Sequence, residues 1–222
     1  MQFSGLKLEF VSLHIPKCGG MSFKEILQNM YGETLQPDYS GAAPVSLRRD
    51  TIVVHGHFVL QKYLRMNLGI FCITWIRNPV ERIISYYNYW KSIPKHSNPS
   101  HNYFIDNKLT LEEFAEYPPI RHELMEGYLE GFDWRHFKFV GILEHFDRDI
   151  NALAVLLKWK APIHIPLLNE GSHDREIPAS IRSHIEKTHS TEMEFYNYWC
   201  ANNSQFNSLG RSGPLSANCV DR

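Results

Sequence analysis

The sequence predicts an α/β protein, with a mostly parallel central sheet of about four to five strands and helices on both faces. Short apolar stretches rich in β-branched residues alternate along the chain with amphipathic helical patterns. This alternation is typical of such sheets, because strands buried on both faces are almost continuously apolar. The chain has 222 residues, 43% hydrophobic and 21% charged. These values are those of an ordinary globular domain and exclude a disordered chain or a small disulfide scaffold.

Periodicity locates the individual elements. Apolar runs predict four strands, at residues 8–14, 51–55, 70–77 and 137–143. Apolar residues at helical spacing predict helices after Gly20, at 59–66, 79–90, 109–117 and 147–158, and one or two helices within 177–201. The longest expected loops between them are 32–50, 93–107 and 162–176.

Local sequence patterns mark the start of two helices. Pro79 follows Asn78, and proline is favoured at the first position of a helix. Thr110, with Glu113 three residues later, predicts a capping box. Because no internal repeat is present, we expect one domain over residues 1–205, followed by a polar, disordered tail over 206–222.

Charge and apolar patterning exclude several classes of protein. The net charge is −1, from 23 Lys and Arg against 24 Asp and Glu, so a nucleic-acid-binding protein is not expected. The longest apolar run, 70–76, is far shorter than the ~20 residues of a transmembrane helix. The N-terminus lacks the apolar core of a secretory signal. We therefore expect a cytoplasmic protein, or one of the Golgi lumen if a leader has been removed. The four cysteines have no metal-binding spacing.

The segment HIPKCGGMSF, at residues 14–23, has the features of a phosphate-binding turn. It follows a predicted strand and opens a helix, its glycines allow close backbone approach, and the free amides of a helix start favour an anion. Lys17 adds a positive charge and Ser22 a hydroxyl donor. A Walker A motif places its lysine after the glycines, whereas Lys17 precedes them, so an ATPase or GTPase fits poorly. The alternative is a turn whose glycines only permit the bend.

A second anion site is predicted where the third strand ends. Arg77 stands at that end, and Ser85 lies two turns into the following helix, on the face that could look back at the strand end. Arginine is suited to bidentate contacts with phosphate. The alternative is that Arg77 pairs with Glu81 and that Ser85 only packs against its neighbours.

Together these segments describe a ligand with two phosphate-like ends, as in 3′-phosphoadenosine 5′-phosphosulfate (PAPS). HIPKCGGMSF resembles the 5′-phosphosulfate loop of the PAPS-dependent carbohydrate sulfotransferases, and RNPVERIISYY, at 77–87, resembles their 3′-phosphate motif. The resemblance implies a three-layer fold like that of P-loop NTPases, with PAPS as cofactor and 3′,5′-adenosine bisphosphate (PAP) as product. It implies 3′-phosphate contacts from Arg77 and Ser85. It implies 5′-phosphosulfate contacts from Pro16, Lys17, Cys18, Gly19, Gly20, Met21, Ser22 and Phe23.

The segment VVHGHFV, at 53–59, resembles the His-Gly-His of the heparan sulfate 2-O-sulfotransferase and uronyl 2-O-sulfotransferase branch, in which a histidine activates the acceptor hydroxyl. Histidines at i and i+2 of an extended segment point the same way, and neutral imidazole suits a general base at neutral pH. We expect His57 to be the base and His55 to support, orient or share that role, with Gly56 leaving room for a substrate. A metal site would need a third ligand, and no metal is expected.

The resemblance extends over roughly residues 9–200. Within 172–198 a Ser-His-x-Arg loop resembles the loop that covers the cofactor in the family. This implies nucleotide contacts from Ser172, His173 and Arg175, and the alternative is an ordinary surface loop.

Two parts of the chain depart from the family pattern. The segments 32–50 and 91–135 align poorly, and we expect the acceptor to contact them because loops carry specificity. Cys18 stands where many relatives have threonine or a small residue. If it is exposed at the helix start, its thiol pKa is lowered and the thiol is reactive.

The sequence therefore predicts direct in-line transfer of the sulfuryl group of PAPS to a hydroxyl, on a saccharide of a glycan or glycoconjugate. Lys17 would neutralise charge on the bridging oxygen, and His57 would take the acceptor proton. Two other classes stay open. A nucleotide-dependent small-molecule kinase would need Mg²⁺ and an acidic ligand at a strand end, where Glu144 is the only tempting carboxylate. A non-catalytic nucleotide-binding module would keep the fold without a working base.

Overall fold

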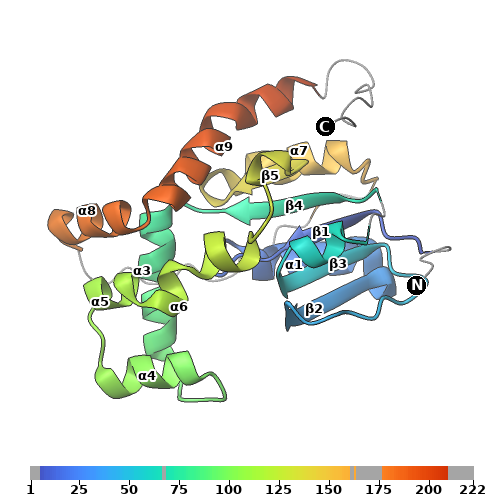
Figure 1. The fold of residues 1–222 in the computed structure, drawn as a ribbon. Helices are drawn as coiled ribbons and strands as arrows, with labels where there is room; N and C mark the ends of the chain where they lie inside the picture. The colour runs from blue at the N-terminus through green and yellow to red at the C-terminus, as the bar shows by residue number, and fades with distance from the viewer. Residues whose placement is uncertain (1–5, 67–68, 161–162, 164–176, 210–222) are drawn as a thin grey trace.

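The centre of the molecule is a parallel sheet of five strands in the order β2-β3-β1-β4-β5. The computed structural model describes residues 6–66, 69–160, 163 and 177–209. The strands are Phe10–Leu13 (β1), Leu35–Gly41 (β2), Val53–Phe58 (β3), Phe71–Ile76 (β4) and Phe139–Ile142 (β5). Helices flank the sheet (Figure 1), which confirms the predicted α/β fold of the P-loop-NTPase type.

Helices connect most of the strands and follow the last of them. They are α1 (Gly20–Tyr31), α2 (Gln61–Leu64), α3 (Pro79–Ser92), α4 (Pro99–Asn107), α5 (Leu111–Glu116), α6 (Pro118–Arg121), a π-helix (Glu123–Tyr128), α7 (Phe146–Leu156), α8 (Ala179–Thr188) and α9 (Ser190–Leu209). Short 3₁₀ turns lie at Gly32–Thr34, Trp134–His136 and Leu143–His145. In Figure 1 the strand arrows point toward α3, and α4, α5, α6 and α8 gather along it.

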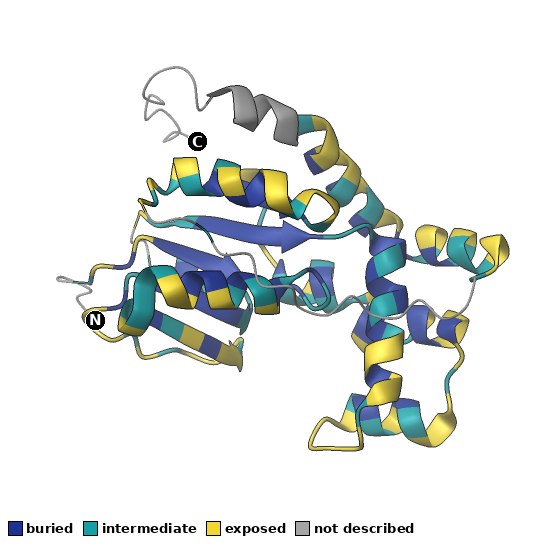
Figure 2. Cartoon of the chain, turned by 180° about the vertical axis from the view of Figure 1, so that it is seen from behind, coloured by how far each residue is buried: buried dark blue, intermediate teal, exposed yellow. Residues whose placement is uncertain are grey.

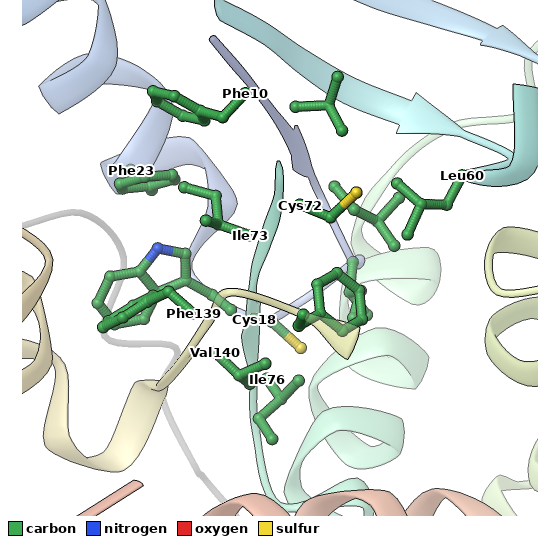
Figure 3. Packing of buried hydrophobic residues seen from close by; sticks show 14 of the residues in the cluster. Phe10, Cys18, Phe23, Leu60, Cys72, Ile73, Ile76, Phe139 and Val140 are labelled. Atoms are coloured by element: carbon green, nitrogen blue, oxygen red, sulfur yellow. The ribbon is translucent and has the colours of Figure 1, made fainter. Parts of the chain in front are cut away.

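The inner strands form the main hydrophobic core. Every residue of β1 and β5 is buried, and Figure 2 shows the inner strands in the dark blue of buried residues. Phe10 and Ile73 meet Phe23 of α1 in this core (Figure 3). Burial of a side chain of this size contributes about 1.5–3 kcal/mol. The carboxyl ends of these strands are therefore held by a densely packed interior.

The strand β2 shows that the loop expected over 32–50 is wrong at its centre. Pro37 and Gly41 concealed the strand in the sequence. β2 lies at the edge of the sheet and pairs with β3, and an edge strand tolerates proline because one of its sides makes no ladder bonds. Lys62 and Tyr63 hold it in place, since the Lys62 ammonium and the Tyr63 hydroxyl lie 2.6 and 2.5 Å from Asp38 Oδ2.

The loop expected over 93–107 is also wrong, because Pro99–Asn107 forms α4. The Asn98 side chain accepts hydrogen bonds from two amides of the first turn, and Pro99 follows it at the first helical position. This repeats the Asn78-Pro79 start of α3. The pattern that located α3 therefore also marks α4. The predicted capping box of Thr110 and Glu113 is confirmed at the start of α5.

A second hydrophobic cluster joins α3 to the smaller helices. We call the part of the molecule formed by α3, α4, α5, α6 and α8 the helical lobe. The buried residues of this hydrophobic cluster are Val80, Ile83, Ile84, Tyr86, Trp90, Phe104, Leu111, Phe114, Ala115, Ile120 and Ile185. The lobe stands at the end of the sheet toward which the strands point (Figure 1), so it borders the edge where ligands are expected.

The C-terminal part differs in detail from expectation. α9 continues to Leu209, into the segment expected to be a tail. The loop expected over 162–176 lies outside the described residues, apart from residue 163. No helix in the described part of the chain combines the length and the apolar character needed to cross a membrane.

Candidate functional site

The segments predicted to carry chemistry meet at the carboxyl edge of the sheet. Leu13, the last residue of β1, pairs with Gly56 of β3 on one side and with Thr74 of β4 on the other. The phosphate-binding turn, the histidine pair and the end of β4 before Arg77 therefore lie next to one another. This is the edge at which parallel α/β sheets bind ligands.

The turn from β1 into α1 has the backbone of an anion-binding loop. Lys17 and Gly19 both have positive φ angles, of 66° and 78°. A side chain at Gly20 is excluded, because a Cβ atom there would lie 1.9 Å from Cδ2 of His14. The turn ends in the 12-residue helix α1, whose first amides have no partner within the helix and favour an anion.

Two cations stand beside this turn. The pKa of Lys17 is lowered by burial and by the nearby positive charge of Arg77. The Lys17 ammonium lies 4.5 Å from the centre of the Tyr89 ring. Among the described residues neither cation forms an ion pair, and Glu81, the alternative partner of Arg77, pairs with Arg182 instead. Two uncompensated positive charges at one place fit a ligand of high negative charge.

Ser85 lies on α3, as predicted, and is half-buried. Within the described part of the chain its hydroxyl has no hydrogen-bond partner, so it is free to donate to a ligand. The Asn78 side chain caps α3, and the Asn78 amide donates to Oε1 of Glu144 at 2.8 Å. Glu144, the carboxylate considered for a kinase metal, thus anchors the backbone at the start of α3.

The other residues of the turn differ in how far their side chains are buried. The Cys18 thiol lies in the core (Figure 3), where burial raises its pKa to about 12. The hypothesis of a reactive thiol is therefore wrong. Phe23 is also fully buried. The amides of both residues donate within the turn, from Cys18 to the Ile15 carbonyl at 3.3 Å and from Phe23 to the Gly19 carbonyl at 3.0 Å. Pro16 and Ser22 are half-buried, and Met21 is exposed.

His57 is half-buried at the end of β3. Its ring centre lies 4.3 Å from that of His14, 5.3 Å from that of Tyr39 and 6.0 Å from that of Tyr128. Burial lowers its pKa below the ordinary value of 6.5, and a hydrogen bond with the His14 backbone opposes this in part. The imidazole is therefore neutral at pH 7 and able to accept a proton.

His55 has a different environment from His57. It is 1% exposed, and its Nδ1 lies 2.9 Å from Oγ of Ser12. Burial lowers its pKa to about 3. Because the ring is enclosed and bonded to β1, this position suits the supporting role rather than direct contact with an acceptor.

His14 is a third histidine of the site, and the sequence analysis assigned it no role. Its ring centre lies 5.2 Å from that of His55 and stacks on His57. Burial first, and then the adjacent His57 and His55, lower its pKa to about 2. The pairing of strands could have revealed it, because the residues after Leu13 and Gly56 are neighbours at the sheet edge.

Gly56 has a different purpose from the one expected. A Cβ atom there would lie 1.8 Å from the carbonyl oxygen of Asp38, so the close approach of β2 requires glycine, and the expectation of room for a substrate is wrong. Ser172, His173 and Arg175 lie outside the described residues. Among the residues that are described, no three His, Cys, Asp or Glu side chains are grouped to hold a metal ion.

The chain is similar to a known protein family and to solved structures. A family model described as "Sulfotransferase family" matches residues 7–199. A sulfotransferase from Alicyclobacillus acidocaldarius is similar with a TM-score of 0.50 and 12% identity, over 87% of this chain and 96% of that one. The mouse sulfotransferase SULT7A1 complexed with PAP gives a TM-score of 0.39 and 12% identity, over 86% and 67% of the two chains. No curated protein matches significantly. At these identities the structural likeness speaks for the fold alone.

Proposed function

Because the chain belongs to the sulfotransferase family, whose members take their sulfuryl group from PAPS, we propose that it transfers this group to a saccharide hydroxyl with His57 as the general base. One observation carries the proposal: the ends of adjacent strands bring two uncompensated cations, a helix start and a neutral imidazole to one edge. The family match argues against the kinase alternative.

The anion-binding groups fit the two charged ends of PAPS. The amides of Gly20, Met21 and Ser22, with the side chains of Lys17 and Ser22, would hold the 5′-phosphosulfate at the start of α1. The amide of Phe23 is used within the helix, where it donates to the Gly19 carbonyl at 3.0 Å. Arg77 and Ser85 would hold the 3′-phosphate, since both keep donors that no described residue uses. The separation of the two groups on β1–α1 and β4–α3 gives each end of the ligand its own strand end.

The proposed chemistry is a single displacement at sulfur. The acceptor oxygen forms a bond to sulfur while the bond between sulfur and the 5′-phosphate oxygen breaks. His57 would accept the proton of the acceptor hydroxyl, and Lys17 would stabilise the negative charge left on the departing oxygen. A positioned general base contributes about 10²–10⁴-fold in rate. The scheme uses no metal.

Support for a saccharide acceptor comes from the likeness of VVHGHFV to the uronyl branch and from the side chains beside His57. Tyr39 is 50% exposed, and the Lys24 ammonium lies 5.5 Å from the centre of its ring. An exposed aromatic ring offers a flat surface for the apolar face of a sugar. The adjacent cation would favour a sugar that carries a carboxylate or a sulfate.

The test is sulfuryl transfer from PAPS to a panel of uronate-containing oligosaccharides, neutral oligosaccharides and a phenol, with wild type, His57→Ala and the control His136→Ala. His136 is exposed and lines a hollow with Phe71, at the start of β4. We expect saccharide sulfation, a 10²–10⁴-fold loss of kcat in His57→Ala with an unchanged Kd for PAP, and wild-type behaviour of the control. Transfer to the phenol alone would refute the saccharide acceptor, and an unchanged kcat in His57→Ala would refute the base.

A further inference from the structure

The ring of His57 is enclosed by aromatic rings from separate elements. His14, the residue after β1, stacks on it at 24° between ring planes, and Tyr128 from the π-helix stacks at 27°. Tyr39 from β2 is inclined to it by 50°. Because two of the three neighbours are nearly parallel to the imidazole, they define the plane in which it can lie.

The π-helix places Tyr128 at this position. Single-turn π-helices are rare and occur often at functional sites. Leu60, two residues after β3, donates its amide to the carbonyl of Tyr128 at 2.9 Å. The backbone of the π-helix is thereby tied to the chain that follows His57.

Glu123, the first residue of the π-helix, lies near the phenol of Tyr128. Burial, and then the nearby Glu123 carboxylate, raise the pKa of that phenol. The Tyr86 hydroxyl of α3 donates to Oε1 of Glu123 at 3.1 Å. Arg82 Nη1 lies 3.8 Å from Oε2 of the same carboxylate. Burial raises the pKa of Glu123 to about 7, although Arg82 opposes the rise.

We propose that Tyr128 is a positioning residue that fixes the orientation of the His57 ring. The inference rests on the proposed base role of His57. Glu123 of the same π-helix contacts Tyr86 and Arg82 of α3, the helix that also carries Ser85. The π-helix that carries Tyr128 thus contacts the helix of the proposed 3′-phosphate site.

The test compares Tyr128→Phe, Tyr128→Ala and the control Tyr103→Ala in the full chain. Tyr103 is also a stacked tyrosine, 5.4 Å from Tyr117 in the helical lobe. We expect Tyr128→Ala to lower kcat about 10–100-fold, since small misplacement of a reacting group can cost 10². We expect Tyr128→Phe, which keeps the ring and loses the hydroxyl near Glu123, to lower kcat about 3–10-fold. The Kd for PAP and the KM for PAPS stay within twofold in both.

A second readout is the imidazole signal of His57 in NMR spectra, followed against pH. The rings that face this imidazole are His14, Tyr39 and Tyr128. The charged or titratable groups behind them are His55, which stacks on His14, and Lys24 of α1, which lies over the ring of Tyr39. In Tyr128→Ala we expect a shifted signal and a rise of the His57 pKa toward 6.5, because one face of the ring becomes open to water. Tyr103→Ala leaves both unchanged.

The outcomes separate this inference from the proposed function. An unchanged His57 signal in both Tyr128 variants, or equal losses of kcat and PAP affinity, would overturn the positioning role. Full activity of His57→Ala with a changed His57 signal in the Tyr128 variants would instead refute the base and leave the positioning of the ring standing. If Tyr128→Ala does not fold, the Tyr128→Phe values of kcat and of the His57 signal decide.

Discussion

Arg77 and Arg82 stand five positions apart at the start of α3, yet the fold uses them in opposite ways. Arg82 is 1% exposed, and its Nη2 lies 2.9 and 2.7 Å from the two carboxylate oxygens of Glu192. Arg77 is half-buried at the end of β4 and forms no ion pair with a described residue. The comparison teaches that carboxylates from other elements make one arginine structural, whereas a strand end leaves the other free for a ligand.

The largest effect is expected at the buried arginine. Arg82→Met leaves the Glu192 carboxylate buried without its partner, and loss of one partner of a buried ion pair costs about 3–5 kcal/mol. Urea denaturation measures the free energy of unfolding. The control is Arg182→Met, which removes a partly exposed pair with Glu81 and should cost about 1 kcal/mol or less. Equal decreases in the free energy of unfolding of Arg82→Met and Arg182→Met would contradict the structural role of Arg82.

The buried histidines test the same contrast between enclosed and open side chains, because their burial makes the free energy of unfolding depend on pH. The pKa values of His55 and His14 are about 3 and about 2 in the folded chain, against about 6.5 when unfolded. Between these values the unfolded chain binds more protons, so stability rises with pH. The free energy of unfolding therefore decreases as pH falls below 6.5. The decrease is up to about 1.4 kcal/mol per pH unit for each histidine, or about 2.7 kcal/mol per pH unit for both.

Denaturation at pH 7, 6 and 5 measures this slope. His55→Asn, which retains a polar group for Ser12, should reduce the slope by about half of the histidine contribution. His136→Ala, at an exposed position, should leave it unchanged. A slope in His55→Asn equal to that of wild type would contradict the burial of a neutral imidazole.

The smallest expected effect on stability is at the open arginine, whose substitution changes binding rather than folding. A hydrogen bond to a charged group contributes about 1.5–3 kcal/mol, so Arg77→Met should weaken PAP binding about 10–150-fold in calorimetric titration. The free energy of unfolding without ligand should change by less than about 0.5 kcal/mol. A large loss of stability would mean that Arg77 is structural, as Arg82 is.

The sequence predicts much of the sheet, because its central strands are continuously apolar and its phosphate-binding turn is local. It does not reveal β2, since Pro37 is read as a loop residue until the strand is known to lie at an edge. The Asn98-Pro99 start of α4 has the same pattern as the Asn78-Pro79 start of α3, but the polar residues around it favour a loop. Local patterns therefore locate inner strands better than edge strands, and a helix start among polar residues is hard to recognise.

The contacts that the sequence does not reveal, in the site and beside it, join residues far apart in the chain. Arg82 and Glu192 are 110 positions apart, and no local pattern connects them. Tyr128 reaches His57 from a π-helix, whose residues do not follow the usual helical period. His14 gains its place through the pairing of β1 with β3. Each of these needs the register of the fold as well as the order of the residues.

The contact between Gly20 and His14 has a consequence for the evolution and engineering of this chain. A Cβ atom at position 20 would collide with the imidazole of His14, so the two positions constrain each other. A library that varies position 20 alone should return glycine, whereas the combination of Gly20→Ala with His14→Ala removes the collision and replaces a poor helix former with a better one. Related chains should therefore exchange these two residues together, as a linked pair, rather than one at a time.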